Sequence, residues 1–230
     1  MSDTPTALML FAAGLGTRMG ELTRHRPKPL IEVAGKALLD HALDLAKGAG
    51  AVPVVVNTHY LAPQIVAHLQ GTSLRISDET EALLETGGGL RKALPLLGPG
   101  PVMTLNTDAI WTGPNVLSTL RRAWQPEQMS ALLALVPRSR ALGYTRSGDF
   151  SLLPDGRIER GGSYVYTGAQ IINPAGIETI PAQAFSLNLL WDRLLAEGRV
   201  YGVLHPGGWC DVGQPQSIAL AEEMLAHDQG

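Results

Sequence analysis

The chain has 230 residues, 45% apolar content and a formal net charge of −3. This is enough apolar material for one large core and too little surplus positive charge for a general nucleic-acid-binding protein. A lone cysteine, Cys210, excludes an internal disulfide and a multi-cysteine metal site. No apolar run approaches the ~18 residues of a membrane span, and the first residues lack the basic region of a secretion signal. We therefore expect a cytoplasmic protein with no nucleic-acid or membrane partner.

Short apolar runs alternate with amphipathic segments along the first part of the chain. Strands are predicted over 7–13, 52–57, 74–77, 101–108 and 130–136, and helices over 38–50, 62–71, 89–98 and 115–124. The third of these helices is expected to break near Pro95, and Asn115 is a plausible N-cap of the fourth. Strand followed by helix, repeated about four times, predicts a mixed, mainly parallel sheet with helices on both faces.

The second part of the chain shows a different pattern of predicted elements. A hairpin is predicted over 148–160 with its turn at 154–156, followed by one or two strands over 163–173. A helix over 186–198, strands over 200–205 and 208–213, and a closing helix over 215–227 complete the chain. No linker, repeat or low-complexity tract separates the parts. We expect the second part to extend the same sheet and to form a wall beside the ligand cleft.

The stretch "LFAAGLGTRMGELTRHRPKPL", residues 10–30, follows the first predicted strand. Its glycines allow backbone N–H groups to turn toward phosphate oxygens. Arg18 can donate to two oxygens at once and Lys28 supplies a compact charge, while Pro27 and Pro29 stiffen the chain around Lys28. An ordinary strand–helix turn with solvated basic residues is the alternative. The Walker pattern is absent, and the dinucleotide pattern fails because Met19 stands where its third glycine belongs.

Two aspartates complete the candidate site. Asp108 follows a predicted strand, at the carboxyl edge of the sheet where Gly14 also falls and where ligands of such sheets bind. Asp211, in "GWCDVG", is the second. As a pair they could hold one Mg²⁺ ion through oxygen ligands, although each could instead be a turn residue. The six histidines show no metal-ligand spacing, and no G-x-S-x-G nucleophile motif is present.

"AAGLGTRM", followed by "RPKPL", resembles the loop of the sugar-1-phosphate nucleotidyltransferases. The later segments "ETGGG", "NTD" and "WCDVG", in this order, resemble the uridylyltransferase branch of peptidoglycan recycling within that family. The resemblance implies a Rossmann-like α/β fold in one domain over 1–230, with a nucleotide-binding half (1–136) and a sugar-binding half (137–230). It implies transfer of UMP from UTP to a sugar 1-phosphate, N-acetylmuramic acid 1-phosphate, by a monomer or small homo-oligomer.

The resemblance also assigns residues. Arg18, Lys28 and Asp108 are expected to be catalytic, with Asp108 and Asp211 holding Mg²⁺, and Glu79 is expected to accept a hydrogen bond from a base N–H group. The glycines of "ETGGG" would place backbone N–H groups against a base edge. The full set expected to bind nucleotide is Ala12, Ala13, Gly14, Gly16, Thr17, Arg18, Lys28, Glu79, Gly87, Gly88 and Asn106.

For the sugar, the resemblance suggests Asn57, Asp149 and Thr167. Larger relatives carry "EKP", whose lysine reaches the sugar phosphate, whereas the corresponding stretch here contains Glu159 and Arg160 but no "KP". This absence favours the short uridylyltransferase branch and leaves Lys28 and the metal to neutralise the sugar phosphate. Two alternatives stay open: a guanylyl- or thymidylyltransferase for another hexose 1-phosphate such as mannose or glucose 1-phosphate, and a non-catalytic nucleotide-binding regulator.

Overall fold

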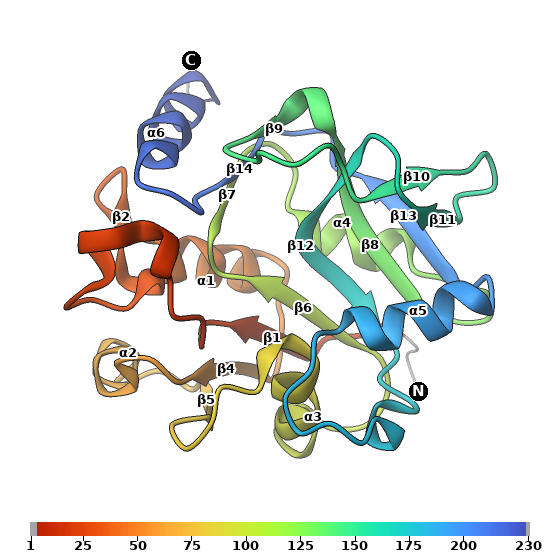
Figure 1. Ribbon diagram of the computed structural model, residues 1–230, viewed down its shortest axis with the longest axis horizontal. Helices are drawn as coiled ribbons and strands as arrows, with labels where there is room; N and C mark the ends of the chain where they lie inside the picture. Colours follow the sequence, from red (N-terminus) through yellow and green to blue (C-terminus); the bar gives the residue numbers. More distant parts are fainter. Residues whose placement is uncertain (1–3, 229–230) are drawn as a thin grey trace.

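The computed structural model describes residues 4–228 and is built on a nine-stranded sheet (Figure 1). Four strands from the first part of the chain pair in parallel, in the order β6-β1-β4-β5. They are β1 (Leu8–Phe11), β4 (Val54–Thr58), β5 (Arg75–Asp78) and β6 (Val102–Asn106). Each was predicted as a strand by the sequence analysis, and all but β5 are short apolar runs.

The second part of the chain extends this sheet, as expected. β12 (Tyr164–Ile172) runs antiparallel to both β6 and β8 (Ala131–Pro137), and β13 (Val200–Leu204) is parallel to β8. The predicted hairpin forms from β10 (Phe150–Leu152) and β11 (Ile158–Arg160) and joins β12 at its beginning. The sheet is therefore mixed, with its parallel part in the first half of the chain.

Helices cover both faces because side chains alternate along each strand. On one face, Leu8 and Leu10 of β1 belong to a core with Leu39 and Leu117, and on the other Met9 belongs to a core with Leu90. The first face carries α1 (Leu38–Gly48), α2 (Ala62–His68) and α4 (Val116–Ala123), and the second carries α3 (Glu85–Leu97) and α5 (Asn188–Ala196). The predicted three-layer arrangement is confirmed.

Smaller elements lie at one edge of the main sheet. β7 (Ala109–Trp111), β14 (Trp209–Asp211) and β9 (Ala141–Leu142) form a three-stranded sheet, and β2 (Glu32–Val33) pairs with β3 (Lys36–Ala37). α6 (Gln216–Asp228) packs beside β14 and β2. Short 3₁₀ helices cover Thr17–Thr23, Lys28–Leu30, Arg138–Arg140 and Ile177–Thr179. Apart from α6, which was predicted, these elements are too short to show a hydrophobic period, and several were not predicted.

The third helix differs from its prediction. α3 begins at Glu85, ahead of the predicted Gly89, and continues through Pro95 to Leu97. Pro95 stands within the last turn, so only the carbonyl group of Arg91, four residues earlier, loses its helical donor. Asn115 caps α4 as predicted, because its side-chain oxygen accepts hydrogen bonds from the N–H groups of Leu117 and Ser118. Within residues 4–228, no helix has the length and apolar character needed to cross a membrane.

Candidate active site

The backbone of the glycine-rich loop packs closely against the side chain of Lys28. Gly16 has a φ of 65°, and a Cβ atom built on it would lie 2.8 Å from the Cβ atom of Lys28. Only glycine allows both this conformation and this approach. The hydroxyl of Thr23 donates to the carbonyl oxygens of Gly16 and Gly20, each at 3.1 Å. The loop is thus held in shape without ligand, and the aliphatic stem of Lys28 packs against it.

Lys28 directs its ammonium group at Asp108. Lys28 Nζ lies 2.8 Å from Asp108 Oδ2, and the lysine side chain is only 11% exposed against 33% for the aspartate. The 3₁₀ helix at Lys28–Leu30 orients the lysine, and β6 delivers Asp108 just beyond its end. A partly buried, charge-assisted contact of this kind fixes both groups before a substrate arrives.

Asp211 is brought beside Asp108 by the small sheet. β14 pairs antiparallel with β7 so that Asp211 stands opposite Ala109, and the N–H group of Val212 donates to the carbonyl oxygen of Asp108 at 2.8 Å. Burial, and then the negative charge of Asp108, raise the pKa of Asp211 to about 6, against the opposing effects of Lys28 and Arg18. The carboxylates of Asp108 and Asp211 therefore lie close together at a partly buried position.

The guanidinium group of Arg18 also approaches Asp211. A Cβ atom built on Gly213 would lie 2.9 Å from Arg18 Nη1 and 3.0 Å from Asp211 Oδ2, so both side chains approach Gly213. A larger residue at this position would push one of them away. The loop cations Arg18 and Lys28 and the two aspartates consequently belong to one site, as the sequence analysis expected.

This donor set fits a divalent cation of the hard type. Within the described residues no three histidine, cysteine, aspartate or glutamate side chains gather into a complete metal site. Asp108 and Asp211 form a pair, and burial together with the charge of Asp108 raises the pKa of Asp211 although Lys28 opposes this. Mg²⁺ is commonly bound by one or two carboxylates together with substrate phosphates and water. The two aspartates match that mode.

The first of two cavities opens beside the loop. Its volume is about 370 Å³. Its lining is Phe11, Ala12, Ala13, Gly14, Lys28, Pro29, Asn57, Glu79, Leu83, Glu85, Thr86, Asn106, Thr107, Asp108 and Ser186. Most of the residues expected to bind nucleotide are in this lining. Gly16 and Thr17 are absent from it, and Gly16 instead lies against the side chain of Lys28.

Asn57 and Glu79 form a buried polar pair at the floor of this cavity. Asn57 Oδ1 accepts a hydrogen bond from the N–H group of Ala12 at 2.7 Å, and Asn57 Nδ2 donates to Glu79 Oε1 at 2.7 Å. Glu79 Oε2 accepts from the N–H group of Leu84 at 3.3 Å. Burial raises the pKa of Glu79, although the hydrogen bond from Asn57 opposes this.

The sequence analysis assigned Asn57 to the sugar. The structure places it in the lining of the first cavity, where its side-chain amide is bonded to Ala12 and Glu79. Glu79 does line the cavity where a base was expected, yet both its oxygens already accept hydrogen bonds from the protein. Together the two side chains fix the start of the loop, because the bond to Ala12 holds the backbone that leads into Gly14.

Gly87 and Gly88, which were expected at a base edge, use their N–H groups within the protein. Their N–H groups both donate to the carbonyl oxygen of Phe185, at 2.8 and 3.1 Å, and neither residue lines a cavity. A Cβ atom on Gly87 would lie 2.4 Å from the Phe185 ring, and one on Gly88 would lie 2.5 Å from the carbonyl oxygen of Gln183. The glycines permit a segment from the second half of the chain, residues 180–187, to pack directly on α3. We call this segment the strap.

The strap is anchored at several points. Arg91 of α3 donates from Nη1 to the carbonyl oxygen of Ile180 at 2.6 Å and from Nη2 to that of Ala182 at 2.7 Å. The N–H group of Leu187 donates to Thr86 Oγ1 at 3.0 Å. The strap therefore places Ser186 and Leu187 at the site, and no motif in the sequence indicated that these residues would be there.

A second cavity of about 610 Å³ lies next to the first, between the strap, β12 and the 144–150 segment. Its lining is Phe11, Arg18, Thr86, Asn106, Asp108, Tyr144, Thr145, Arg146, Asp149, Phe150, Arg160, Tyr166, Thr167, Gly168, Ser186, Leu187, Asn188, Trp191, Trp209 and Asp211. Asp149 and Thr167, expected at the sugar, are both in it. The aromatic residues from the second half, Arg146 and Arg160 were not assigned to the site, because they are scattered over several elements.

Asp149 and Thr167 are held by the protein itself. Asp149 Oδ1 accepts from the hydroxyl of Tyr144 at 2.8 Å, and its Oδ2 accepts from the N–H group of Tyr166 at 2.9 Å. Burial and the contact with Asp149 raise the pKa of Tyr144 to about 12. Thr167 is almost fully buried and donates its hydroxyl proton to the carbonyl oxygen of Ala134 at 2.7 Å. Both residues shape the cavity wall through these bonds.

The two cavities share a wall. Five residues line both: Phe11, Thr86, Asn106, Asp108 and Ser186. Asn106 is supported there by Gly168 of β12, where a Cβ atom would lie 2.8 Å from the Cβ atom of Asn106 and where the pairing of β12 with β8 slips between Tyr166 and Gln170. A ligand in each cavity would meet its neighbour beside Asp108.

The fold and the comparisons with known proteins agree on the class: the chain is a nucleotidyltransferase. It belongs to the MobA-like NTP transferase domain family, which matches residues 8–197. It is 44% identical to the N-acetylmuramate alpha-1-phosphate uridylyltransferase of Caulobacter vibrioides, over 98% of this chain and 99% of that protein. It is 35% identical to the protein of the same name from Neisseria meningitidis serogroup B, over 89% of this chain and 92% of that one.

Among solved structures, HddC from Yersinia pseudotuberculosis superposes with a TM-score of 0.75 at 19% identity, over 95% of this chain and 98% of that one. At this identity the likeness concerns the fold alone. The expected family and fold class are thus confirmed. Enzymes of this family generally use a divalent metal ion, which agrees with the aspartate pair.

Proposed function

We propose that the protein transfers UMP from UTP to N-acetylmuramic acid 1-phosphate, which yields the UDP-sugar and pyrophosphate. Full-length similarity to the Caulobacter uridylyltransferase supports the choice of both substrates. The observation that carries the proposal is the shared wall of the two cavities, because it brings a nucleotide and a second phosphorylated ligand together beside Asp108 and Lys28.

We infer that the nucleotide occupies the first cavity, with its phosphates along the loop of Ala12, Ala13 and Gly14. The sugar 1-phosphate occupies the second cavity, with its phosphate near Asp108 and Asp211. An oxygen of the sugar phosphate attacks the α-phosphorus of UTP. A new P–O bond forms while the bond from the α-phosphorus to the β-bridging oxygen breaks, and pyrophosphate leaves with that electron pair.

The residues act by positioning and by compensating charge. Lys28 is directed at the shared wall, where the two anions meet, and Arg18, which lines the second cavity beside Asp211, adds positive charge for the phosphates there. Asp108 and Asp211 would hold Mg²⁺, which supplies charge neutralisation and Lewis-acid polarisation at the α-phosphate. No covalent enzyme intermediate is needed, since the attacking oxygen comes from the second substrate.

We also propose that the reaction belongs to cell-wall recycling in the cytoplasm. The acceptor sugar is a cell-wall component, and UTP is a cytoplasmic metabolite. The lone cysteine, Cys210, which is buried, agrees with a reducing compartment.

A pyrophosphate-release assay tests the proposal. UTP, GTP and dTTP are each supplied with N-acetylmuramic acid, N-acetylglucosamine, glucose and mannose 1-phosphates in the presence of Mg²⁺. We expect the highest kcat/KM for UTP with N-acetylmuramic acid 1-phosphate. A clear preference for GTP or dTTP, or for another sugar, would overturn the assignment of substrates.

The catalytic roles are tested with Lys28→Ala and Asp108→Ala. Loss of a preorganised charge at the reacting phosphate commonly lowers turnover by about 10²–10³-fold, and we expect losses of at least this size with the fold retained. Lys36→Ala is the matched control, since Lys36 forms an exposed pair with Asp44 away from both cavities. Near-normal turnover of Asp108→Ala in Mg²⁺ would show that the metal assignment is wrong.

A further inference from the structure

We propose that Arg160 binds a carboxylate on the sugar, so that the second cavity selects acidic sugar 1-phosphates. This inference rests on the proposed function and concerns the same site. Arg160 ends β11 and lines the second cavity but not the first. No role follows for it from the transfer of UMP, which needs cations only where phosphates meet.

The cations around the two cavities stand in separate places. Lys28 contacts Asp108, Arg18 approaches Asp211 beside Gly213, and Arg146 lies 3.5 Å from Asp149 Oδ1. Arg160 instead stands among residues of β10 and α5, with its Cζ atom 5.2 Å from the ring centroid of Phe150 and 5.7 Å from that of Trp191. A substrate that extends through this cavity from its phosphate would meet a second positive charge at Arg160.

The guanidinium group of Arg160 is held in place before any ligand binds. Its Nε and Nη2 atoms donate to Asp192 Oδ1, at 3.1 and 2.6 Å. The aromatic support is itself fixed, because the indole N–H group of Trp191 donates to Gln170 Oε1 at 2.9 Å in the buried core. A planar guanidinium on aromatic faces loses little freedom when it binds a carboxylate.

Arg160 still has donors to offer. Both bonds to Asp192 end on one oxygen, and among residues 4–228 none accepts a hydrogen bond from Arg160 Nη1. The pair is partly open to solvent, with the Arg160 side chain 42% exposed. An exposed ion pair of this kind is weak, so an incoming carboxylate can share the guanidinium without breaking a buried contact.

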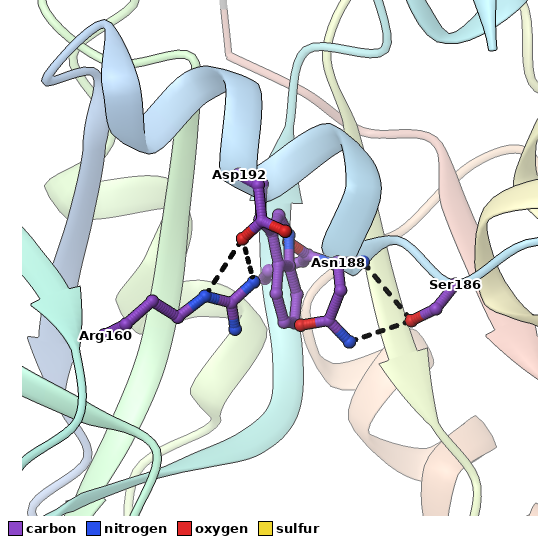
Figure 2. A network of polar contacts seen from close by, with 6 residues as sticks. Arg160, Ser186, Asn188 and Asp192 are labelled. Atoms are coloured by element: carbon purple, nitrogen blue, oxygen red, sulfur yellow. Dashed lines mark hydrogen bonds and ion pairs between the residues drawn. The ribbon is translucent and has the colours of Figure 1, made fainter.

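A row of polar groups connects Arg160 to the shared wall of the cavities. Figure 2 shows Asn188 between Arg160 and Ser186, beneath the start of α5. Asn188 Nδ2 donates to Ser186 Oγ at 2.8 Å, and both residues line the second cavity. Polar atoms therefore line the second cavity between the shared wall, where we place the phosphate, and the guanidinium group of Arg160.

The chemistry of the proposed sugar matches this layout. N-acetylmuramic acid is N-acetylglucosamine with a lactyl ether, whose carboxylate stands away from the phosphate at C1. A neutral hexose would place no anion against Arg160. An ion pair between an arginine and a substrate carboxylate gives specificity as well as affinity, because a sugar that lacks the carboxylate cannot form it.

Arg160→Gln and Arg160→Lys test the inference, with N-acetylmuramic acid 1-phosphate and N-acetylglucosamine 1-phosphate compared. We expect Arg160→Gln to raise the KM for the acidic sugar by about 10–100-fold, the usual effect of losing a charge-assisted hydrogen bond, with kcat changed by less than about 3-fold. The Ki of N-acetylglucosamine 1-phosphate as a competitor should stay unchanged. Arg160→Lys keeps the positive charge but loses the planar guanidinium group, so its KM for the acidic sugar should lie between those of the wild type and Arg160→Gln.

Arg157→Gln is the matched control. Arg157 lies in the same hairpin, pairs with Asp155 and lines neither cavity, so this variant should leave both constants as in the wild type. Equal effects of Arg160→Gln on the two sugars, or none on either, would overturn the inference while the wild-type activity still upholds the proposed function. A wild-type enzyme that prefers a neutral sugar 1-phosphate would overturn the proposed substrate and this inference together.

Discussion

The N–H group of Val212 donates a 2.8 Å hydrogen bond to the carbonyl oxygen of Asp108. This bond continues the pairing of β14 with β7 and sets Asp211 opposite Ala109, so that two carboxylates from distant parts of the chain converge. The backbone imposes their proximity whether or not a cation is present. The metal-free protein must therefore accommodate two neighbouring negative charges, and this has a consequence for its stability.

Asp211→Asn should stabilise the metal-free protein at neutral pH. The pKa of Asp211 is about 6 in the folded protein against a usual value of 3.8. Between these values the folded state holds a proton that the unfolded state releases, so the contribution of Asp211 to stability is lost as pH rises through the interval. Asparagine has no such charge to desolvate. Urea unfolding at pH 4 to 8 without divalent ions should show the variant gaining on the wild type as pH rises.

The same variant should lose catalytic activity at every pH, because one of the two proposed metal ligands is gone. Stability and activity then change in opposite directions at pH 7. A variant that is less stable than the wild type at pH 7, with a difference that does not vary with pH, would contradict the prediction that the charge of Asp211 destabilises the metal-free protein.

Gly14→Ala separates the role of the loop in binding from its role in folding. A Cβ atom on Gly14 would meet no protein atom within 4 Å, and its φ is not in the left-handed region. We therefore expect a melting temperature within about 2 °C of the wild type, since surface changes of this kind cost at most ~0.5 kcal/mol. If phosphates approach the Gly14 backbone, the new methyl group should raise the KM for UTP by at least about 10-fold.

Gly16→Ala is the contrasting variant. Its Cβ atom would lie 2.8 Å from the Cβ atom of Lys28 at a φ of 65°, so it should lower both stability and activity. Calorimetry with UTP and thermal unfolding on both variants check the comparison. Unchanged UTP binding by a fully folded Gly14→Ala variant would move the phosphates away from this part of the loop.

Asn57→Asp should make stability strongly dependent on pH. Asn57 Nδ2 donates to Glu79 Oε1 at 2.7 Å in a buried place, and an aspartate there would set two carboxylates against each other. At least one of them would take up a proton above its usual pKa, so the variant loses stability as pH rises. We expect a loss of about 3 kcal/mol at pH 7, recovered in part near pH 5, and measurable by urea unfolding.

Asn173→Asp is the control for this substitution. Asn173 Oδ1 accepts a hydrogen bond from the N–H group of Ala175 at the surface, which a carboxylate also accepts. A pH profile of Asn57→Asp that runs parallel to the wild-type profile would show that Glu79 and residue 57 are not electrostatically coupled.

Local patterns explain which parts of the molecule were predictable. The apolar runs of β1, β4 and β6 and the N-cap of α4 are decided by neighbouring residues, so they were found from the sequence. The loop from Gly14 to Lys28 is likewise a short-range feature. The position of Asp108 followed from the rule that ligands bind at the carboxyl edge of a parallel sheet, whereas Asp211 was paired with it only from its motif, because the pairing of β14 with β7 is a long-range feature.

Long-range pairing explains what was not predictable. Asn57 was recognised as polar at a strand end, but only the fold shows that its amide is used by Ala12 and Glu79. The glycines at 87 and 88 were noticed for their missing side chains, yet their partner is Phe185, a residue in no recognisable motif. Arg160 and Asn188 both line the second cavity only because α5 packs on the sheet close to the β10–β11 hairpin, which is the edge of that sheet (Figure 1).

Gly88→Ala tests the role of the strap. The added methyl carbon would lie 2.5 Å from the carbonyl oxygen of Gln183, a backbone atom that can move only if the strap moves. We expect a loss of about 1–3 kcal/mol in the free energy of unfolding and faster amide exchange at Phe185 and Leu187, whose N–H groups are bonded to Leu84 and Thr86. Because the strap carries Ser186 into the shared wall, the KM values for both substrates should rise together. Gly14→Ala, with no protein atom in reach of its methyl group, is the control for stability. Wild-type exchange and stability in Gly88→Ala would show that the strap does not depend on the missing side chain.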